Sequence, residues 1–239
     1  MEKRRDSATA YIILADGFET IEALTPLDVL RRCGVEVTTI SLNKTRAVRS
    51  SHGVTVEADA TMEEYMLKRN NAGSSSTAGS TSNAGSNTSN AGTSSSAGSA
   101  SGSTNTSNAG SSTTAGSCLR QALILPGGYP GYKNLCDSPE VGALITQFHK
   151  EGKLLCAICG APTALKANQI CRGAAITCHT SVKEELSDYY SILSSAVVKY
   201  MNIITGMGAG RSLDFAFAIA EALTSKEKVE EIKAKMEII

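Results

Sequence analysis

Residues 154–163 have the sequence LLCAICGAPT, in which an apolar run leads directly into a turn of small residues and then into helix-forming residues. A buried strand that turns sharply into a helix places the residue at the turn above the carboxyl end of the sheet. Ligands of open α/β sheets bind at that edge. The stretch therefore predicts a strand at 153–158, a helix to about residue 167, and Cys159 at the turn between them.

The same alternation of short apolar strands and longer helices continues on both sides of this stretch. Further strands are predicted at 11–15, 35–42, 52–57, 121–125, 174–178 and 197–205. Further helices are predicted at 62–69, 138–150, 210–223 and 226–236, together with one that ends near Cys33 and begins either at Pro26 or earlier, with a kink there. Nearly continuous apolar strands that alternate with helices are typical of a parallel sheet covered on both faces, which is an α/β fold.

Residues 72–117 interrupt this pattern with Ala, Gly, Ser, Thr and Asn only. A segment without large apolar side chains cannot bury enough surface to offset its conformational entropy, so we expect a flexible, low-complexity coil. The rest of the chain, residues 1–71 and 118–239, is then a single domain with one long inserted surface loop.

The composition argues against several classes of function. The 23 Lys and Arg residues balance 23 Asp and Glu residues, so no basic surface for nucleic acid is indicated. No apolar run approaches the roughly 18 residues that a membrane span needs. We expect no export signal, because only a short apolar run follows the charged N-terminus. The 7 cysteines then indicate free thiols in a reducing compartment, and we expect a cytoplasmic protein.

Cys159 is the first candidate for chemistry. The free N–H groups and the dipole at the start of the following helix favour a thiolate, so we expect the pKa of this thiol to fall below its usual value of about 8.5. A buried structural cysteine at a tight turn is the alternative. Cys156 completes a C-x-x-C pair, but it lies within the apolar strand, which favours core packing over a redox pair or a zinc site. The glycines at 206–210 are weak evidence for a nicotinamide cofactor, because Arg211 stands where a third glycine would be needed.

Four motifs in order carry a resemblance to a known family. They are LADGFETIE at 14–22, LPGG at 125–128, AICGAPTAL at 157–165 and GAG at 208–210. The chain resembles the ThiJ/PfpI family, most closely its parkinsonism-associated protein deglycase branch. The resemblance covers essentially all residues outside the insert. It implies a flavodoxin-like three-layer sandwich of the class I glutamine amidotransferase-like type, a homodimer, and a reactive cysteine at Cys159.

The resemblance also assigns roles to residues around this cysteine. Glu22 falls on the family's glutamate beside the sulfur, where burial and a neighbouring thiolate raise a carboxyl pKa and allow the protonated acid to donate a hydrogen bond. His179 falls on a histidine that assists proton transfer. The backbone N–H groups of Gly127, Gly128 and Gly160 are expected to form an oxyanion hole.

Two positions depart from the family's patterns. Gly160 follows the cysteine where the PfpI-type hydrolases have histidine, which argues against proteolysis. Cys178, next to His179, is not typical of the branch.

The function implied is a cysteine-dependent, cofactor-free conversion of α-oxoaldehydes such as methylglyoxal, or of their early protein or nucleotide adducts, to 2-hydroxy acids. No metal or organic cofactor is expected, and the partners expected are the small substrate and a second copy of the chain. The alternative is a redox sensor or chaperone-like protein active in oxidative stress, in which the same thiol is oxidised by peroxide.

Overall fold

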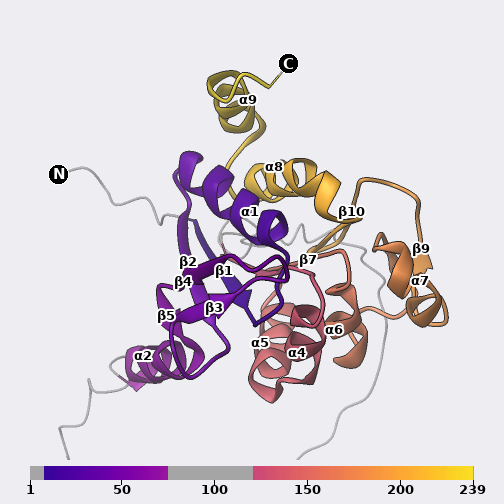
Figure 1. Ribbon diagram of the computed structural model, residues 1–239. Helices are drawn as coiled ribbons and strands as arrows, with labels where there is room; N and C mark the ends of the chain where they lie inside the picture. Colours follow the sequence, from indigo (N-terminus) through magenta and orange to yellow (C-terminus); the bar gives the residue numbers. More distant parts are fainter. Residues whose placement is uncertain (1–7, 75–120, 239) are drawn as a thin grey trace, which may run out of the picture.

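The computed structural model describes residues 8–74 and 121–238, which fold around one seven-stranded sheet (Figure 1). The strand order is β10-β11-β7-β6-β1-β2-β5, and every neighbouring pair is parallel except β10 with β11. The strands are β1 (Thr9–Leu14), β2 (Glu36–Ser41), β5 (Ala60–Thr61), β6 (Gln121–Leu125), β7 (Leu154–Ile158), β10 (Val197–Tyr200) and β11 (Ile203–Gly206). The carboxyl ends of the parallel strands therefore share one edge, where β7 leads into Cys159.

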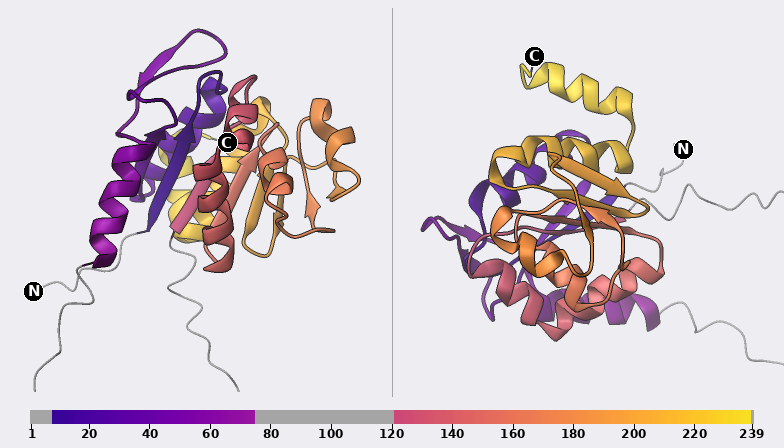
Figure 2. Two further views of the ribbon diagram at one scale, coloured as in Figure 1. Left: turned by 90° about the horizontal axis from the view of Figure 1, so that it is seen from below. Right: turned by 90° about the vertical axis from the view of Figure 1, so that its right-hand side faces the viewer.

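Helices cover both faces of the sheet, which gives three layers (Figures 1 and 2). One face carries α1 (Thr20–Arg32) and α8 (Ser212–Leu223), with α9 (Lys226–Lys235) packed outside α8. The other face carries α2 (Met62–Ser74), α4 (Gly131–Asp137), α5 (Pro139–Lys150) and α6 (Pro162–Ala167), and α7 (Thr180–Leu186) packs beside α6. The predicted α/β sandwich is confirmed.

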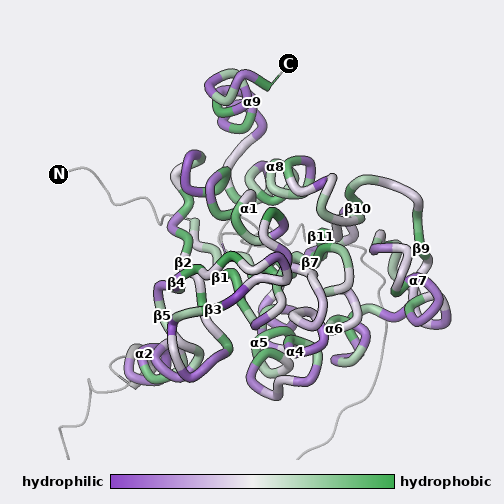
Figure 3. Tube along the Cα trace, in the orientation of Figure 1, coloured by the Kyte–Doolittle hydropathy of each residue, from purple (hydrophilic) through white to green (hydrophobic). Residues whose placement is uncertain are grey.

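Alternate residues of the central strands pack into two separate cores. In β1, Ile12 belongs to the core under α1 and α8, whereas Ile13 belongs to the core under α5 and α6. Strands that bury both faces need apolar residues at successive positions, as their sequences predict. Figure 3 shows this as hydrophobic colour along the central strands, while the outer helix α9 carries many hydrophilic positions.

Helix starts follow the local sequence. Ser138 caps α5 by accepting a hydrogen bond from the Val141 N–H at 3.2 Å, and Pro139 takes the first helical position. The start of α1 is at Thr20 with Glu19 as its cap, so Pro26 lies inside the helix and the earlier of the two expected starts is observed.

Two predicted strands lie outside the main sheet. The segment predicted at 52–57 forms β4 (Thr55–Glu57), which pairs with β3 (Ala47–Arg49) in an antiparallel hairpin. The segment predicted at 174–178 contributes only β8 (Ala175–Ile176), paired with β9 (Ser191–Ile192). The Thr177 N–H donates to the Thr205 side chain instead of a neighbouring strand's carbonyl, which stops β8 from extending.

The insert and the membrane prediction have different outcomes. Most of the coil predicted at 72–117 lies outside the described residues, and its first three residues belong to α2. Within the part of the chain that the structure describes, no helix combines the length and the apolar character needed to span a bilayer.

Candidate active site

Cys159 lies directly after β7 in a backbone conformation that residues other than glycine rarely adopt, with φ of +65°. Its backbone is held on both sides, because its N–H donates to the Gly206 carbonyl at 3.0 Å and its carbonyl accepts from the His179 N–H at 2.9 Å. A strained residue persists only where its surroundings determine its conformation, and such residues gather at functional sites. The sharp turn predicted at Cys159 is therefore present, and the sheet and the 177–179 segment hold it in place.

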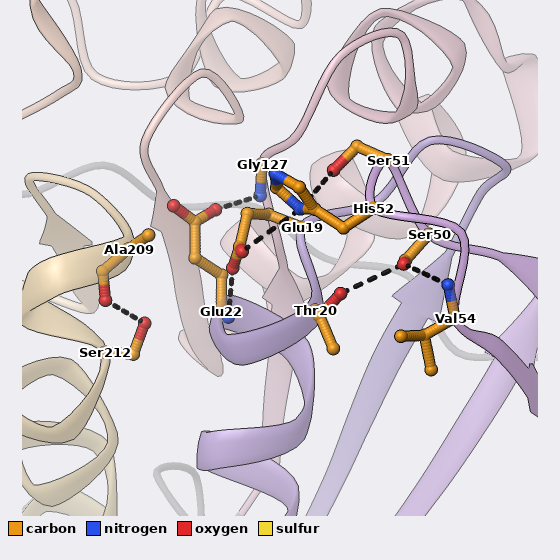
Figure 4. A network of polar contacts seen from close by, with 10 residues as sticks. All are labelled: Glu19, Thr20, Glu22, Ser50, Ser51, His52, Val54, Gly127, Ala209 and Ser212. Carbon is orange, nitrogen blue, oxygen red and sulfur yellow. Dashed lines mark hydrogen bonds and ion pairs between the residues drawn. The ribbon is translucent and has the colours of Figure 1, made fainter.

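Glu22 reaches the cysteine from the first turn of α1 and is fully buried. Its Oε2 accepts a hydrogen bond from the Gly127 N–H at 2.8 Å, as Figure 4 shows. The Cys159 thiol is the side chain that hydrogen-bonds this carboxyl, whereas Oε1 takes no N–H or O–H donor from the described residues. The carboxyl is thus oriented by one amide and is otherwise left to the thiol.

Gly127 separates the two reactive side chains. A Cβ built on it would lie 2.6 Å from Cys159 Cβ, 2.7 Å from Glu22 Oε2 and 3.1 Å from Cys159 Sγ. No side chain fits there without displacing the carboxyl or the thiol. Because the Gly127 N–H already donates to Glu22, it is not free to bind an oxyanion, unlike the expectation from the sequence.

The other two glycines direct their amides at the sulfur. Hydrogen bonds from the backbone N–H groups of Gly128 and Gly160 lower the pKa of the Cys159 thiol. A Cβ on Gly160 would lie 2.7 Å from the Tyr132 ring, so glycine lets this ring pack against the turn. The predicted group of three amides is reduced to these two donors.

Burial dominates the electrostatics of both reactive groups. Desolvation raises the pKa of Glu22 from 4.5 to about 7, opposed by its hydrogen bonds with Cys159 and Gly127. Desolvation, followed by the charge of Glu22 and the hydrogen bond to it, raises the pKa of Cys159 to about 12. The expected lowering of this pKa is therefore wrong for the free site. The following helix, α6, has only 6 residues, and its amides do not outweigh burial beside a carboxylate.

The two groups together hold at most one negative charge at neutral pH, because ionising both would place two charges in a poorly hydrated space. At least one proton therefore stays on the thiol and the carboxyl, which are hydrogen-bonded to each other. Such a pair can release the sulfur as a nucleophile only as the proton passes to Glu22.

His179 is next to Cys159 through its backbone, but its side chain has another partner. The imidazole is exposed and caps α7, with Nδ1 accepting from the Ser181 N–H at 3.2 Å and lying 2.8 Å from the Ser181 hydroxyl oxygen. The groups that shift the pKa of Cys159 are Glu22 and the two glycine amides, and His179 is not one of them. The structure brings the side chains of Glu22 and Cys159 together, and it leaves the exposed imidazole of His179 at the rim of this site.

Comparison with known proteins identifies the family to which this fold belongs. The model of the DJ-1/PfpI family matches residues 8–72 and 77–222. The chain belongs to the DJ-1/PfpI family. Protein dj-1beta of Drosophila melanogaster is 30% identical over 227 residues, which are 95% of each chain. Its crystal structure superposes with a TM-score of 0.73 at 29% identity and covers 98% of this chain and 99% of the other. The flavodoxin-like, class I glutamine amidotransferase-like fold that the resemblance implied is confirmed.

A second relative has a name that states an activity. The glutathione-independent glyoxalase DJR-1.2 of Caenorhabditis elegans is 38% identical over 107 residues, which are 44% of this chain and 56% of that protein. The DJ-1/PfpI family therefore includes a glyoxalase.

The structure adds residues to this DJ-1/PfpI site that the sequence did not indicate. His52, in the turn between β3 and β4, lies with Nδ1 3.9 Å from Glu19 Oε1 (Figure 4). Glu19 in turn accepts from the Glu22 N–H at 2.7 Å, and its charge contributes to the raised pKa of Glu22. The hairpin that delivers His52 is not apparent from hydropathy, so no local signal could have placed it here.

The remaining cysteines have structural surroundings. Cys156 is fully buried within β7, and burial raises the pKa of its thiol, as the core-packing interpretation of the C-x-x-C pair predicts. Cys178 is buried too, and desolvation raises its pKa. All 6 cysteines of the described residues are free thiols. No group of three or more His, Cys, Asp or Glu side chains able to hold a metal occurs in residues 8–74 and 121–238.

Proposed function

We propose that this protein is a glutathione-independent glyoxalase that converts α-oxoaldehydes such as methylglyoxal to 2-hydroxy acids, and that it acts in the same way on their early adducts with amino or thiol groups. The observation that carries the proposal is the buried Cys159–Glu22 pair. In it a carboxyl with a pKa of about 7 is hydrogen-bonded to a cysteine that a strained turn holds at the carboxyl edge of the sheet. The family membership supports it, because a relative is named as a glyoxalase.

The first step forms a carbon–sulfur bond. Sγ of Cys159 attacks the aldehyde carbon while the thiol proton passes to Glu22, so two negative charges never coexist in the site. The electron pair of the C=O bond moves to oxygen. The amides of Gly128 and Gly160 stabilise this oxyanion, which then takes the proton from Glu22 to give a hemithioacetal.

The second step is a proton transfer between adjacent carbons. Glu22, ionised again, removes the hydrogen of the former aldehyde carbon, and a proton returned to the neighbouring carbon gives the thioester of a 2-hydroxy acid. His179, at the rim, is suited to exchange this proton with solvent. Water then cleaves the thioester, which releases the acid and restores the thiol. The steps exchange only protons and water, so neither a metal nor an organic cofactor has a role in them.

The test is lactate formation from methylglyoxal without glutathione. Wild type is expected to form lactate, and Cys159→Ala is expected to fall to the background rate. Cys171→Ala, which removes another partly exposed free thiol, is the matched control and should keep the wild-type rate. Wild-type lactate formation no faster than that of Cys159→Ala would show that the protein has no such activity.

A second function is favoured by the same pair, a peroxide sensor with a protective, chaperone-like role. Glu22 Oε1 has no N–H or O–H donor among the described residues, so a protonated Glu22 has an oxygen available to hydrogen-bond an oxidised sulfur. Peroxide would oxidise Cys159 to a sulfinic acid, adding two oxygen atoms to the sulfur. Intact mass after mild peroxide treatment tests this. The gain of two oxygens should occur at Cys159 and disappear in Glu22→Ala, whereas oxidation spread over several cysteines would contradict it.

We also propose that the protein is a homodimer in the cytoplasm, where reducing conditions keep its thiols free. Two apolar side chains near the site, Ile21 on α1 and Val54 in the β3–β4 hairpin region, are 48% and 44% exposed. Exposed apolar side chains of this size are commonly covered at subunit contacts. Sedimentation at micromolar concentration is expected to give about twice the chain mass of 24.9 kDa, and a monomer only would refute the dimer.

A further inference from the structure

A cavity with a volume of about 430 Å³ lies at the opposite edge of the sheet from Cys159, among β1, β2, β6, α2 and α5. Its position is fixed by Gln121, the first residue of β6, and by Tyr11, which pairs with Thr38 of β2 near the amino ends of the strands. Its lining residues are Tyr11, Thr38, Ala60, Tyr65, Lys68, Arg69, Gln121, Phe148 and Lys153. The volume falls within the range of about 300–1,000 Å³ that is usual for small-molecule sites.

One wall of this cavity is aromatic. The ring centroids of Tyr11 and Tyr65 are 5.1 Å apart, and those of Tyr11 and Phe148 are 6.1 Å apart with an edge-to-face angle of 89°. The two tyrosines are partly buried, and Phe148 is buried beneath them. Burial raises the pKa of Tyr65 to about 12, so this hydroxyl stays protonated at neutral pH. Such a surface suits a flat ring.

The other wall is cationic. Lys68, Arg69 and Lys153 line the cavity, and none of its lining residues is acidic. Lys153 also pairs with Glu151 at 2.5 Å and lies 5.3 Å from the centroid of Phe148, so part of its charge is already compensated. Glu64 interacts with the charge of Lys68, and Glu151 with that of Arg69, so these two carboxylates outside the lining compensate part of the positive charge of the three cations.

Arg69 supplies the observation that points to a ligand. Its guanidinium hydrogen-bonds the Tyr65 hydroxyl, yet Nη1 is buried without a hydrogen-bond partner among residues 8–74 and 121–238. Buried donors without a partner are rare, because an N–H that loses its hydrogen bond to water on burial and gains no other destabilises the folded protein. An acceptor that enters the cavity would restore this bond.

We propose that this cavity binds a phosphate monoester that carries a flat ring, of the mononucleotide class. The ring would pack on Tyr11 and Tyr65. The phosphate would accept hydrogen bonds from Arg69 and would be attracted by the positive charge of Lys68. A phosphate monoester carries about −1.5 to −2 charges at pH 7, which matches two cations better than one carboxylate does. Its oxygens also fit the fork of a guanidinium. The site shares no residue with the Cys159 pair, so it is independent of the proposed reaction.

Calorimetric titration of the full chain tests the site with three probes: adenosine 5′-monophosphate, adenosine and inorganic phosphate. The nucleotide is expected to bind at least tenfold more tightly than either fragment, because only it uses both walls. Arg69→Gln is expected to weaken nucleotide binding at least tenfold. Tyr65→Leu is expected to weaken the nucleotide but leave the affinity for phosphate within twofold.

Arg172→Gln is the matched control, because Arg172 also lies over a tyrosine ring, 5.6 Å from the centroid of Tyr189, but outside the cavity. It should bind the nucleotide as wild type does. Lys68→Gln, at an exposed position, serves as the second charge variant if Arg69→Gln proves unstable in thermal unfolding. Nucleotide binding that is no tighter than phosphate binding, or that survives both charge variants, would overturn the proposal, as would the absence of binding by all three probes.

Discussion

The two edges of the sheet handle charge in opposite ways. At the carboxyl edge, Cys159 and Glu22 are desolvated and hold at most one negative charge between them, and the pKa of each group is raised. At the amino edge, the cavity bounded by Lys68 and Arg69 gathers positive charge against aromatic rings. The Cys159–Glu22 pair holds a proton that can be transferred in a reaction. The cavity attracts an anion but contains no nucleophile or acid of this kind.

This difference shows that burial, more than the number of charges, separates a reactive site from a binding site. A desolvated acid responds strongly to any change of its charge or packing, whereas partly exposed cations are screened by salt. The two edges should therefore respond differently to the same perturbation.

Filling the space between the reactive side chains should give the largest effect. In Gly127→Ala the new methyl group would collide with Cys159 Cβ and Glu22 Oε2 at 2.6 and 2.7 Å. A displacement of this size should slow alkylation of Cys159 by iodoacetamide about 100-fold, and overpacking should cost about 1–3 kcal/mol of stability. Alkylation followed by peptide mass spectrometry, with a thermal unfolding curve, measures both.

Gly210→Ala is the control for this change, because nothing lies within 4 Å of the added Cβ. It should alkylate at the wild-type rate. Nucleotide binding at the amino edge should be the same in both variants. A Gly127→Ala protein with unchanged thiol reactivity would mean that the sulfur and the carboxyl do not need their observed positions.

Neutralising the buried acid should stabilise the protein in a pH-dependent way. The pKa of Glu22 is about 7 in the folded chain and 4.5 in the unfolded one, so the folded state binds more protons between these values and stability falls as pH rises from 4.5 through 7. Glu22→Gln avoids this loss and should raise the free energy of unfolding by roughly 3 kcal/mol above pH 7. Near pH 4 the difference should almost vanish. Denaturant unfolding at several pH values measures it, and equal gains at pH 4 and pH 8 would contradict the raised pKa.

Salt should distinguish the two edges directly. Raising NaCl from about 0.05 to 0.5 M shortens the screening length severalfold and should weaken nucleotide binding by about fivefold. The rate of Cys159 alkylation by the neutral reagent iodoacetamide should change by less than about twofold, because buried pairs are screened little. A thiol rate that follows salt as strongly as nucleotide binding does would remove the proposed distinction.

The smallest effect is expected at His179. Its imidazole caps α7 through the Ser181 N–H, so His179→Ala should cost about 1 kcal/mol of stability. Lactate formation should fall by less than about tenfold, because the Cys159–Glu22 pair keeps its contacts. Ser181→Ala is the control, since it keeps the backbone cap and removes the hydroxyl beside Nδ1. A loss of activity as large as that of Cys159→Ala would place His179 among the essential groups.

The sequence predicted the parts of the fold that depend on local pattern. The apolar run before Cys159 predicted β7 and the turn, and Ser138 with Pro139 predicted the start of α5, because capping and strand burial act over a few residues. The segment 174–178 was predicted wrongly as a full strand, since the Thr205 side chain takes the Thr177 N–H. This bond joins residues 28 positions apart, which no hydropathy pattern reveals.

The chemistry of the site was less predictable than its location. Motifs placed Glu22 beside Cys159, and the structure brings them together. The raised pKa of the thiol and the use of the Gly127 amide by Glu22 depend on how deeply both groups are buried, which is a property of the packed loops. His52 reaches Glu19 only because a hairpin folds back over the start of α1.

The loops that hold Glu22 are interlocked through glycine. A Cβ on Gly17 would lie 2.4 Å from the Pro130 ring, and one on Gly128 would lie 2.3 Å from the Glu19 nitrogen. Both positions also have φ values near +90°, at +86° and +89°. A saturation mutagenesis scan should therefore leave these two positions almost empty of tolerated alleles, while residues of the outer helix α9 accept many. Substitutions should therefore accumulate outside these loops during evolution. Directed evolution for new substrates should randomise residues around the Cys159–Glu22 site instead, at His52, Tyr129 and His179.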